Sequence, residues 1–94
     1  MKPRIGRTIY TVYIDQISEE VVKFLGENSF IVANYENYDA NYEFNYDDYN
    51  KDWFTSLSKA KAEMRKIFPN KKIKFIECRD RFTNTKFWEV WEAE

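Results

Sequence analysis

The residues best suited to chemistry lie in one acidic, tyrosine-rich stretch, residues 34–52. Six carboxylates stand there against one lysine, and five tyrosines recur among them. Carboxylates set between tyrosines can imitate the charge of a nucleic-acid backbone while the rings anchor on a protein surface. The pattern predicts a partner-binding surface made of Tyr35, Glu36, Tyr38, Asp39, Glu43, Asp47, Asp48, Tyr49 and Asp52.

A structural explanation of the same stretch stays open. The acids would then face water or pair with the lysine-rich C-terminal part, where residues 53–94 carry ten basic and six acidic side chains. Tyr42, Phe44 and Tyr46 would cover one face of a sheet. The two explanations differ in whether the carboxylates find partners inside the fold.

Other chemistries lack the residues they need. The chain has no histidine, which removes Ser-His and Cys-His catalysis and the usual zinc sites. Its two glycines form no phosphate-binding loop, and the acids do not follow the offsets of a calcium-binding EF-hand. Cys78, the single cysteine, lies in a strand-like run and is interpreted as structural. We therefore expect no enzyme, no catalytic residue, no cofactor and no metal.

Length and composition indicate a single domain spanning residues 1–94. An aromatic content of 19% can supply a core for so short a chain. One cysteine and no secretory leader favour a reducing, cytoplasmic location. No window approaches the roughly 18 apolar residues of a membrane span.

The first half of the chain is dominated by strand patterns. Residues 1–7 are expected to be a loose basic lead-in, followed by a strand at 8–14. Residues 19–25 are compatible with a strand or a short helix. A strand is favoured because a link containing Gly26 and Asn28 joins them to a strand at 29–33. A loop at 34–40, a strand at 41–46 and a turn at 47–52 follow.

The second half holds one helix and a hairpin. Thr55 or Ser56 caps a helix at about 56–68, which ends before Pro69-Asn70. Strands at 71–79 and 86–92 form a C-terminal β-hairpin. The predicted fold class is α+β, an antiparallel sheet or partial small barrel of about six strands with this helix placed before the last hairpin. The expected core is Tyr10, Val12, Ile14, Val22, Phe24, Ile31, Phe54, Leu57, Ala60, Met64, Ile67, Phe75, Trp88 and Val90.

The segment Tyr46 to Lys61 has the pattern Tyr-x-Asp-Tyr-x-Lys-x-Trp-Phe-Thr-Ser-Leu-Ser-x-Ala-Lys. In this pattern the chain resembles small uncharacterised proteins of Firmicutes phages and mobile elements. The resemblance implies a small β-rich domain with one packed helix in a mobile-element setting, and it implies no enzyme and no ligand.

The leading functional hypothesis is a non-enzymatic binding protein of phage type that acts in the host cytosol. Its partner would be a host protein with a basic surface, and an inhibitor of a nucleic-acid-binding defence nuclease, anti-CRISPR-like in action, fits that description. The alternative is a small nucleic-acid-binding module that uses the basic helix and the C-terminal hairpin through Lys59, Lys66, Lys71, Lys72 and Lys74. The overall acidity of the chain favours the first hypothesis, and a homodimer stays open under either.

Overall fold

The computed structural model describes residues 1–33, 41–81 and 85–93. The elements are β1 (Thr8–Tyr13), β2 (Gln16–Leu25), β3 (Ser29–Ala33), β4 (Asn41–Asn45), the 3-10 helix η1 (Tyr46–Asp48), β5 (Trp53–Phe54), α1 (Leu57–Ile67), β6 (Ile73–Arg79) and β7 (Lys86–Glu92).

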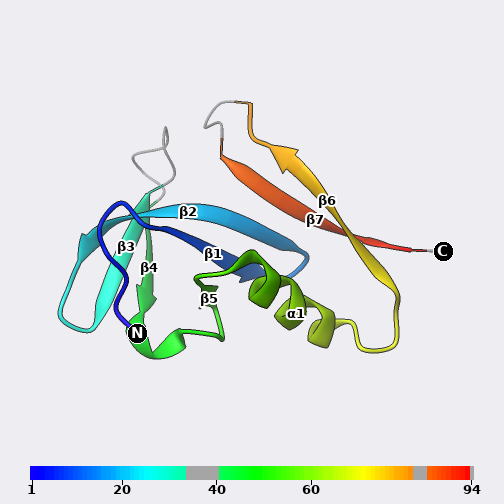
Figure 1. Cartoon of the computed structure of the whole chain (residues 1–94), viewed down its shortest axis with the longest axis horizontal. Helices are drawn as coiled ribbons and strands as arrows, with labels where there is room; N and C mark the ends of the chain where they lie inside the picture. Colours follow the sequence, from blue (N-terminus) through cyan, green and yellow to red (C-terminus); the bar gives the residue numbers. More distant parts are fainter. Residues whose placement is uncertain (34–40, 82–84, 94) are drawn as a thin grey trace.

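Within the described residues, seven strands form a curled antiparallel sheet, a half-barrel with α1 packed against it (Figure 1). The strand order is β4-β3-β2-β1-β5, and the β6–β7 hairpin joins the sheet through β7. β2 pairs with β1 along one edge, and its other edge is shared by two strands, β7 and β3. It pairs with β7 up to Ser18 and with β3 from Val21 onward, so Glu19 and Glu20 lie where the sheet forks.

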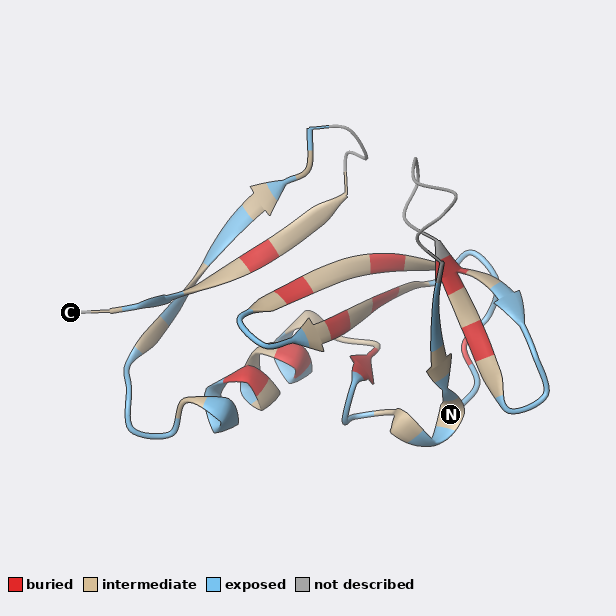
Figure 2. Cartoon of the chain, turned by 180° about the vertical axis from the view of Figure 1, so that it is seen from behind, coloured by how far each residue is buried: buried red, intermediate tan, exposed pale blue. Residues whose placement is uncertain are grey.

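Each face of the sheet carries one buried cluster. The residues of the two clusters lie on β1, β2, β3, β5, α1 and β7 (Figure 2). On the concave face, side chains of the β3–β4 hairpin pack against those of β1, β2 and β5. On the opposite face, α1 and the β6–β7 hairpin pack against side chains of β1, β2 and β5. The concave cluster comprises Ile9, Val22, Phe30, Val32 and Trp53. The helix-side cluster comprises Ile17, Phe54, Ala60, Met64 and Trp88.

Local sequence explains the helix, whereas the first hairpin turns at a β-branched residue that local preference disfavours there. Ser56 is the N-cap of α1, and its hydroxyl accepts a hydrogen bond from the backbone N–H of Lys59. Ala60 and Met64, four residues apart, share the buried side of α1. Ile14 has a φ of 47°, a left-handed conformation that turns the chain between β1 and β2.

The predicted fold class is confirmed, including the helix before the C-terminal hairpin. The strand predicted at 19–25 is confirmed and begins earlier, at Gln16. The additional strand is the two-residue β5, which pairs with Tyr10 and Thr11 of β1. The loop predicted at 34–40 lies outside the described residues.

The predicted core needs correction at three positions. Ile14 is 66% exposed because it forms a turn, and Phe24 is 64% exposed because it follows a β-bulge between Val22 and Phe24. Ile67, at the last turn of α1, is 49% exposed. The predicted core also omits most of the concave cluster. It assumes that only one face of each strand is buried, whereas this sheet carries a buried cluster on each face. The buried apolar residues absent from the predicted core are Ile9, Ile17, Phe30, Val32 and Trp53.

Trp53 should be far more important for stability than the exposed Trp91. Its ring is fully buried, and its Nε1 donates to the backbone carbonyl of Asn45 at 2.9 Å. We expect Trp53→Phe to lower the free energy of unfolding by about 2 kcal/mol, because it leaves a void and an unpaired carbonyl. Trp91→Phe should change it by less than about 0.5 kcal/mol. Urea unfolding followed by circular dichroism compares the two, and equal losses would contradict the assigned core.

Candidate functional site

The acidic part of the predicted surface is a compact turn between β4 and β5. Asp47 and Asp48 lie in η1, and Asp52 directly precedes β5. The backbone carbonyl of Asp48 accepts hydrogen bonds from the N–H groups of Lys51 and Asp52, both at 3.0 Å. Asn50 completes the turn with a φ of 66°. We call residues 46–52 the acidic turn.

The acidic turn is fixed to the core by Tyr49. The Tyr49 ring packs on Trp53 with 4.7 Å between ring centroids, and the Tyr49 hydroxyl is 3.2 Å from Thr55 Oγ1. Asn50 N–H donates to the Trp53 carbonyl at 2.8 Å, and Val12 N–H donates to the Asp52 carbonyl at 3.2 Å. The backbone that carries the three aspartates is therefore held in place before any partner arrives.

The carboxylates themselves have no partners in the described part of the chain. Asp47 and Asp52 are exposed and Asp48 is half-buried, and none of the three makes an ion pair there. The two described ion pairs are Lys66–Glu63 and Lys71–Glu92, at 3.4 and 3.5 Å. The alternative that this turn pairs with the lysine-rich helix therefore has no support among the described residues.

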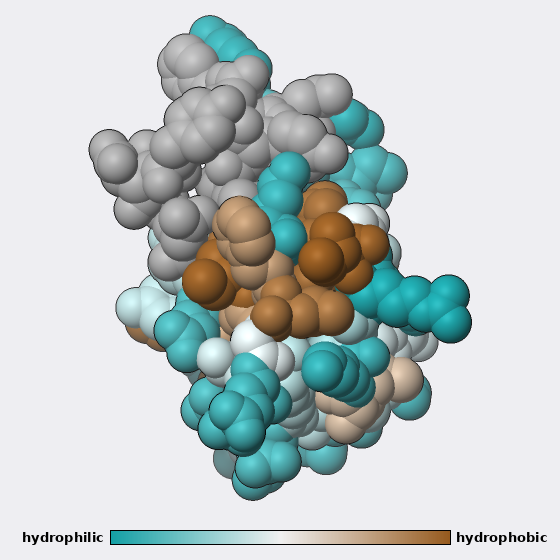
Figure 3. Space-filling view, turned by 90° about the vertical axis from the view of Figure 1, so that its left-hand side faces the viewer, coloured by the Kyte–Doolittle hydropathy of each residue, from teal (hydrophilic) through white to brown (hydrophobic). Residues whose placement is uncertain are grey.

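An exposed apolar surface lies at the same end of the fold. Tyr46, the first residue of the acidic turn, donates its hydroxyl to the Gly26 carbonyl at 2.8 Å and its N–H to the Asn28 carbonyl at 3.1 Å. These bonds tie the turn to the β2–β3 hairpin, where Phe24 is 64% exposed and Leu25 37%. Figure 3 looks onto this end of the molecule and shows apolar side chains gathered in its middle, with polar side chains below them. Exposed apolar groups beside charged ones are typical of protein-binding surfaces.

The structure brings part of the predicted surface together. Asp47, Asp48, Tyr49 and Asp52 share the acidic turn, whereas Glu43 lies on β4 and accepts a hydrogen bond from the Ser29 hydroxyl at 2.7 Å. Tyr49 serves the core more than the surface, because its ring covers Trp53. The remaining predicted residues, Tyr35, Glu36, Tyr38 and Asp39, lie outside the described residues.

Sequence reasoning missed the exposed Phe24, which it placed in the core. No sequence pattern marks the β-bulge that turns this ring outward, because the bulge arises from pairing with β3. The strand pattern at 19–25 does not indicate which side of the sheet is exposed to solvent.

The basic residues of α1 and β6 are partly engaged within the fold. Lys61 Nζ lies 5.3 Å and Arg65 Cζ 5.2 Å from the Phe75 ring centroid, in cation–π contacts. Lys66 and Lys71 pair with glutamates. These contacts reduce the number of basic side chains on α1 and β6 that are free to neutralise nucleic-acid phosphates.

Other candidate chemistries find no site in the described residues. No group of three or more acidic or cysteine side chains there could hold a metal ion. Cys78 is half-buried on β6, and its Sγ lies 3.6 Å from the Ile76 carbonyl. No described helix is long and apolar enough to cross a membrane.

Glu20 is a buried carboxyl group at the fork of the sheet. It is 8% exposed, stands opposite Ile9 across β1–β2, and its Oε2 has no hydrogen-bond partner. Removal from water disfavours the charged form, so burial raises the pKa of Glu20 to about 7. Nothing in the sequence distinguishes Glu20 from Glu19, which precedes it on the other face of β2 and is less buried.

Comparison of the chain with family models, with curated proteins and with solved structures gives no match.

Glu20 should make stability depend on pH. Because its pKa is higher in the folded state than the ordinary 4.5, the folded chain retains a proton that the unfolded chain loses as pH rises. The free energy of unfolding should fall by about 3 kcal/mol between pH 4 and 8 from this group alone.

Glu20→Gln should remove that component. The difference in unfolding free energy between the variant and the original chain should therefore grow in favour of the variant from about pH 4.5 to about 7 and stay constant above that. Urea unfolding at a series of pH values measures it, and the difference cancels the titration of all other groups. Glu27→Gln, at an exposed position, is the matched control. A difference that does not change with pH would show that Glu20 is not desolvated.

Proposed function

We propose that the chain is a non-enzymatic binding protein that docks on a basic surface of another protein through the acidic turn. The observation that carries the proposal is a turn fixed to the core whose three aspartates make no ion pair within residues 1–33, 41–81 and 85–93. The same turn is tied to a hairpin with exposed apolar side chains. A pre-organised turn loses little conformational freedom on binding.

The two parts of this surface have different roles in the proposal. The aspartates steer the partner and select for positive charge, which mainly affects the association rate and the specificity. Phe24 and Leu25 provide apolar area that is removed from water on contact, as anchor residues do at interfaces. Neither part requires a bond to be made or broken.

The partner class that this chemistry suits is a nucleic-acid-binding protein, since its basic surface already accommodates rows of anionic groups. A host defence nuclease inhibited in this way would agree with the resemblance of the Tyr46–Lys61 segment to proteins of phages and mobile elements. The acidic turn would then occupy the place of nucleic-acid phosphates.

Direct nucleic-acid binding through α1 and the β6–β7 hairpin is the competing function. Its best support is the exposed Trp91 next to Lys74 on β6, because a ring beside a cation can stack a base. The cation–π contacts and ion pairs of the neighbouring basic residues weaken it. Labelled single-stranded DNA separates the two functions, since only the competing one predicts a salt-dependent complex.

The test is affinity capture from a host lysate with two baits, the original chain and a triple variant that combines Asp47→Asn, Asp48→Asn and Asp52→Asn. The amides keep the size of the side chains and remove three charges. A partner retained by the original chain should bind the variant at least about tenfold more weakly, because each lost charge contact is worth on the order of 1 kcal/mol or more. The partner, once identified by mass spectrometry and purified, is titrated with both chains.

Two controls make the result specific. Glu77→Gln removes an exposed acid from β6, far along the chain from the acidic turn, and should leave binding unchanged. Added nucleic acid should displace the partner if the aspartates occupy a nucleic-acid site. Equal binding by the triple variant and the original chain would overturn the proposal.

A further inference from the structure

Residues 1–7, which we call the strap, run from η1 to the start of β1 and are held at several points (Figure 1). Gly6 N–H donates to the Val22 carbonyl at 2.8 Å, and Val22 N–H donates to the Arg7 carbonyl at 2.9 Å. Pro3 is buried, and Lys2 Nζ lies 5.6 Å from the Tyr46 ring centroid. The strap is therefore an ordered part of the fold, in contrast to the loose lead-in that the sequence suggests.

A tight turn inside the strap brings two arginines together. Arg7 N–H donates to the Arg4 carbonyl at 3.1 Å, and Gly6 at the third position has a φ of 86°, as a type II turn requires. The ends of such a turn lie within roughly 7 Å between Cα atoms. A residue other than glycine would be strained at position 6, so the turn geometry depends on this glycine.

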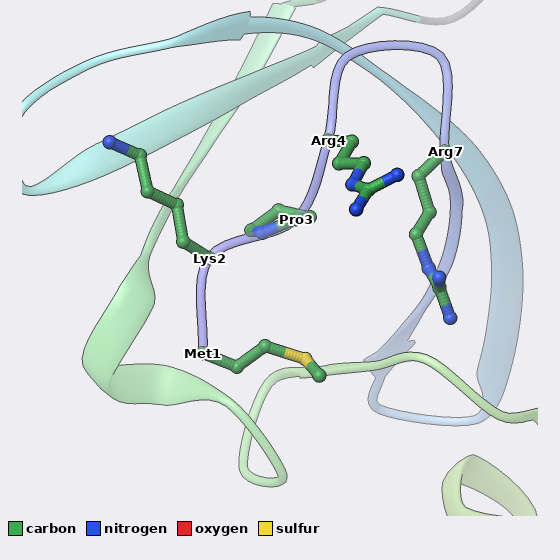
Figure 4. Close-up of a pocket in the computed structure, with 5 residues that line it drawn as sticks. All are labelled: Met1, Lys2, Pro3, Arg4 and Arg7. Atoms are coloured by element: carbon green, nitrogen blue, oxygen red, sulfur yellow. The ribbon is translucent and has the colours of Figure 1, made fainter.

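The side chains of the strap line a small cationic pocket that is open to solvent. The pocket has a volume of about 370 Å³ and is lined by Met1, Lys2, Pro3, Arg4 and Arg7. The side chains of Arg4 and Arg7 border the same opening, while Lys2 extends away from them (Figure 4). In the described part of the chain, neither arginine makes an ion pair, and no carboxylate lines the pocket. Two neighbouring guanidinium groups without a counter-ion repel each other, and an anion between them relieves that repulsion.

We propose that the strap binds a small phosphate-bearing anion, such as pyrophosphate or a phosphate monoester, between Arg4 and Arg7. The planar guanidinium group presents its N–H donors as a fork that matches two oxygens of a phosphate group, and two such forks can hold one ligand. Lys2 lines the pocket, but its ammonium group lies over the Tyr46 ring, so the two arginines carry the site. This site is separate from the proposed protein-binding role of the acidic turn and does not depend on it.

A small anion suits the surroundings better than a polynucleotide. The Lys2 contact with Tyr46 places the strap against the acidic turn, where Asp47 and Asp48 follow directly in η1. A long chain of phosphates leaving the pocket on that side would be repelled by these carboxylates. The pocket is also at the low end of the roughly 300–1,000 Å³ typical of ligand sites.

The test is isothermal titration of the whole chain with pyrophosphate at low ionic strength. We expect saturable binding to one site, weakened about tenfold or more by combined Arg4→Gln and Arg7→Gln, because both charge-assisted forks are lost. Arg81→Gln, at another exposed arginine, is the matched control and should bind as the original chain does. Arg4→Lys with Arg7→Lys should bind with intermediate strength, since charge remains and the fork is lost.

Several outcomes would overturn the proposal. These are no binding by the original chain, an equal loss in the Arg81→Gln control, or single-stranded DNA that binds more tightly and displaces pyrophosphate. Unfolding curves verify that the double variant is folded. Because Arg4 and Arg7 are exposed, replacing them should leave the fold intact. The triple asparagine variant of the acidic turn should keep pyrophosphate binding, so failure of one proposal is distinguishable from failure of the other.

Discussion

The fold depends on two adjacent residues that send their rings to opposite faces of the sheet. Trp53 and Phe54 form β5, and consecutive side chains of a strand point in opposite directions. The Trp53 ring meets Phe30 edge-on at 4.8 Å in the concave cluster. Phe54 packs in the helix-side cluster with Ala60 and Met64. Since β5 also pairs with β1, this dipeptide joins the curled half of the sheet to the half covered by α1.

The candidate surface follows from that anchoring. Tyr49 lies on Trp53, and the Trp53 indole binds the carbonyl at the end of β4, so the segment between β4 and β5 has little freedom. Its aspartates are displayed by a backbone that the core holds, and the Tyr46 hydroxyl links the same segment to the β2–β3 hairpin. The core thus holds the acidic turn against the end of β2, where the Gly26 carbonyl lies 20 residues before Tyr46 in the chain.

Charge in this protein is separated more than it is paired. The aspartates of the acidic turn, which make no ion pair among the described residues, the arginines of the strap and the lysines of α1 form distinct surface regions. Lys66 and Lys71, in the C-terminal half, pair with Glu63 and Glu92. Because exposed ion pairs are weak, leaving these charges apart costs little stability. Each one-signed region produces a local electrostatic field that can select partners. The buried Glu20 opposes stability at neutral and higher pH, and the large aromatic clusters offset it.

The sequence by itself determined the fold class, the capped helix and the C-terminal hairpin. These elements rest on local patterns, namely the Ser56 cap, the apolar spacing of α1 and the turn between two strand-like runs. The sequence also identified residues 34–52, which end in the acidic turn, as the stretch where negative charge accumulates. Only the tertiary structure decided that each face of the sheet carries a buried cluster, that Phe24 is exposed, that Glu20 is enclosed and that the strap forms a pocket. These properties arise from the curl of the sheet and from pairings between distant strands. Adjacent residues such as Ile9 and Tyr10, or Glu19 and Glu20, carry similar local signatures, and long-range packing alone determines which of the two is buried.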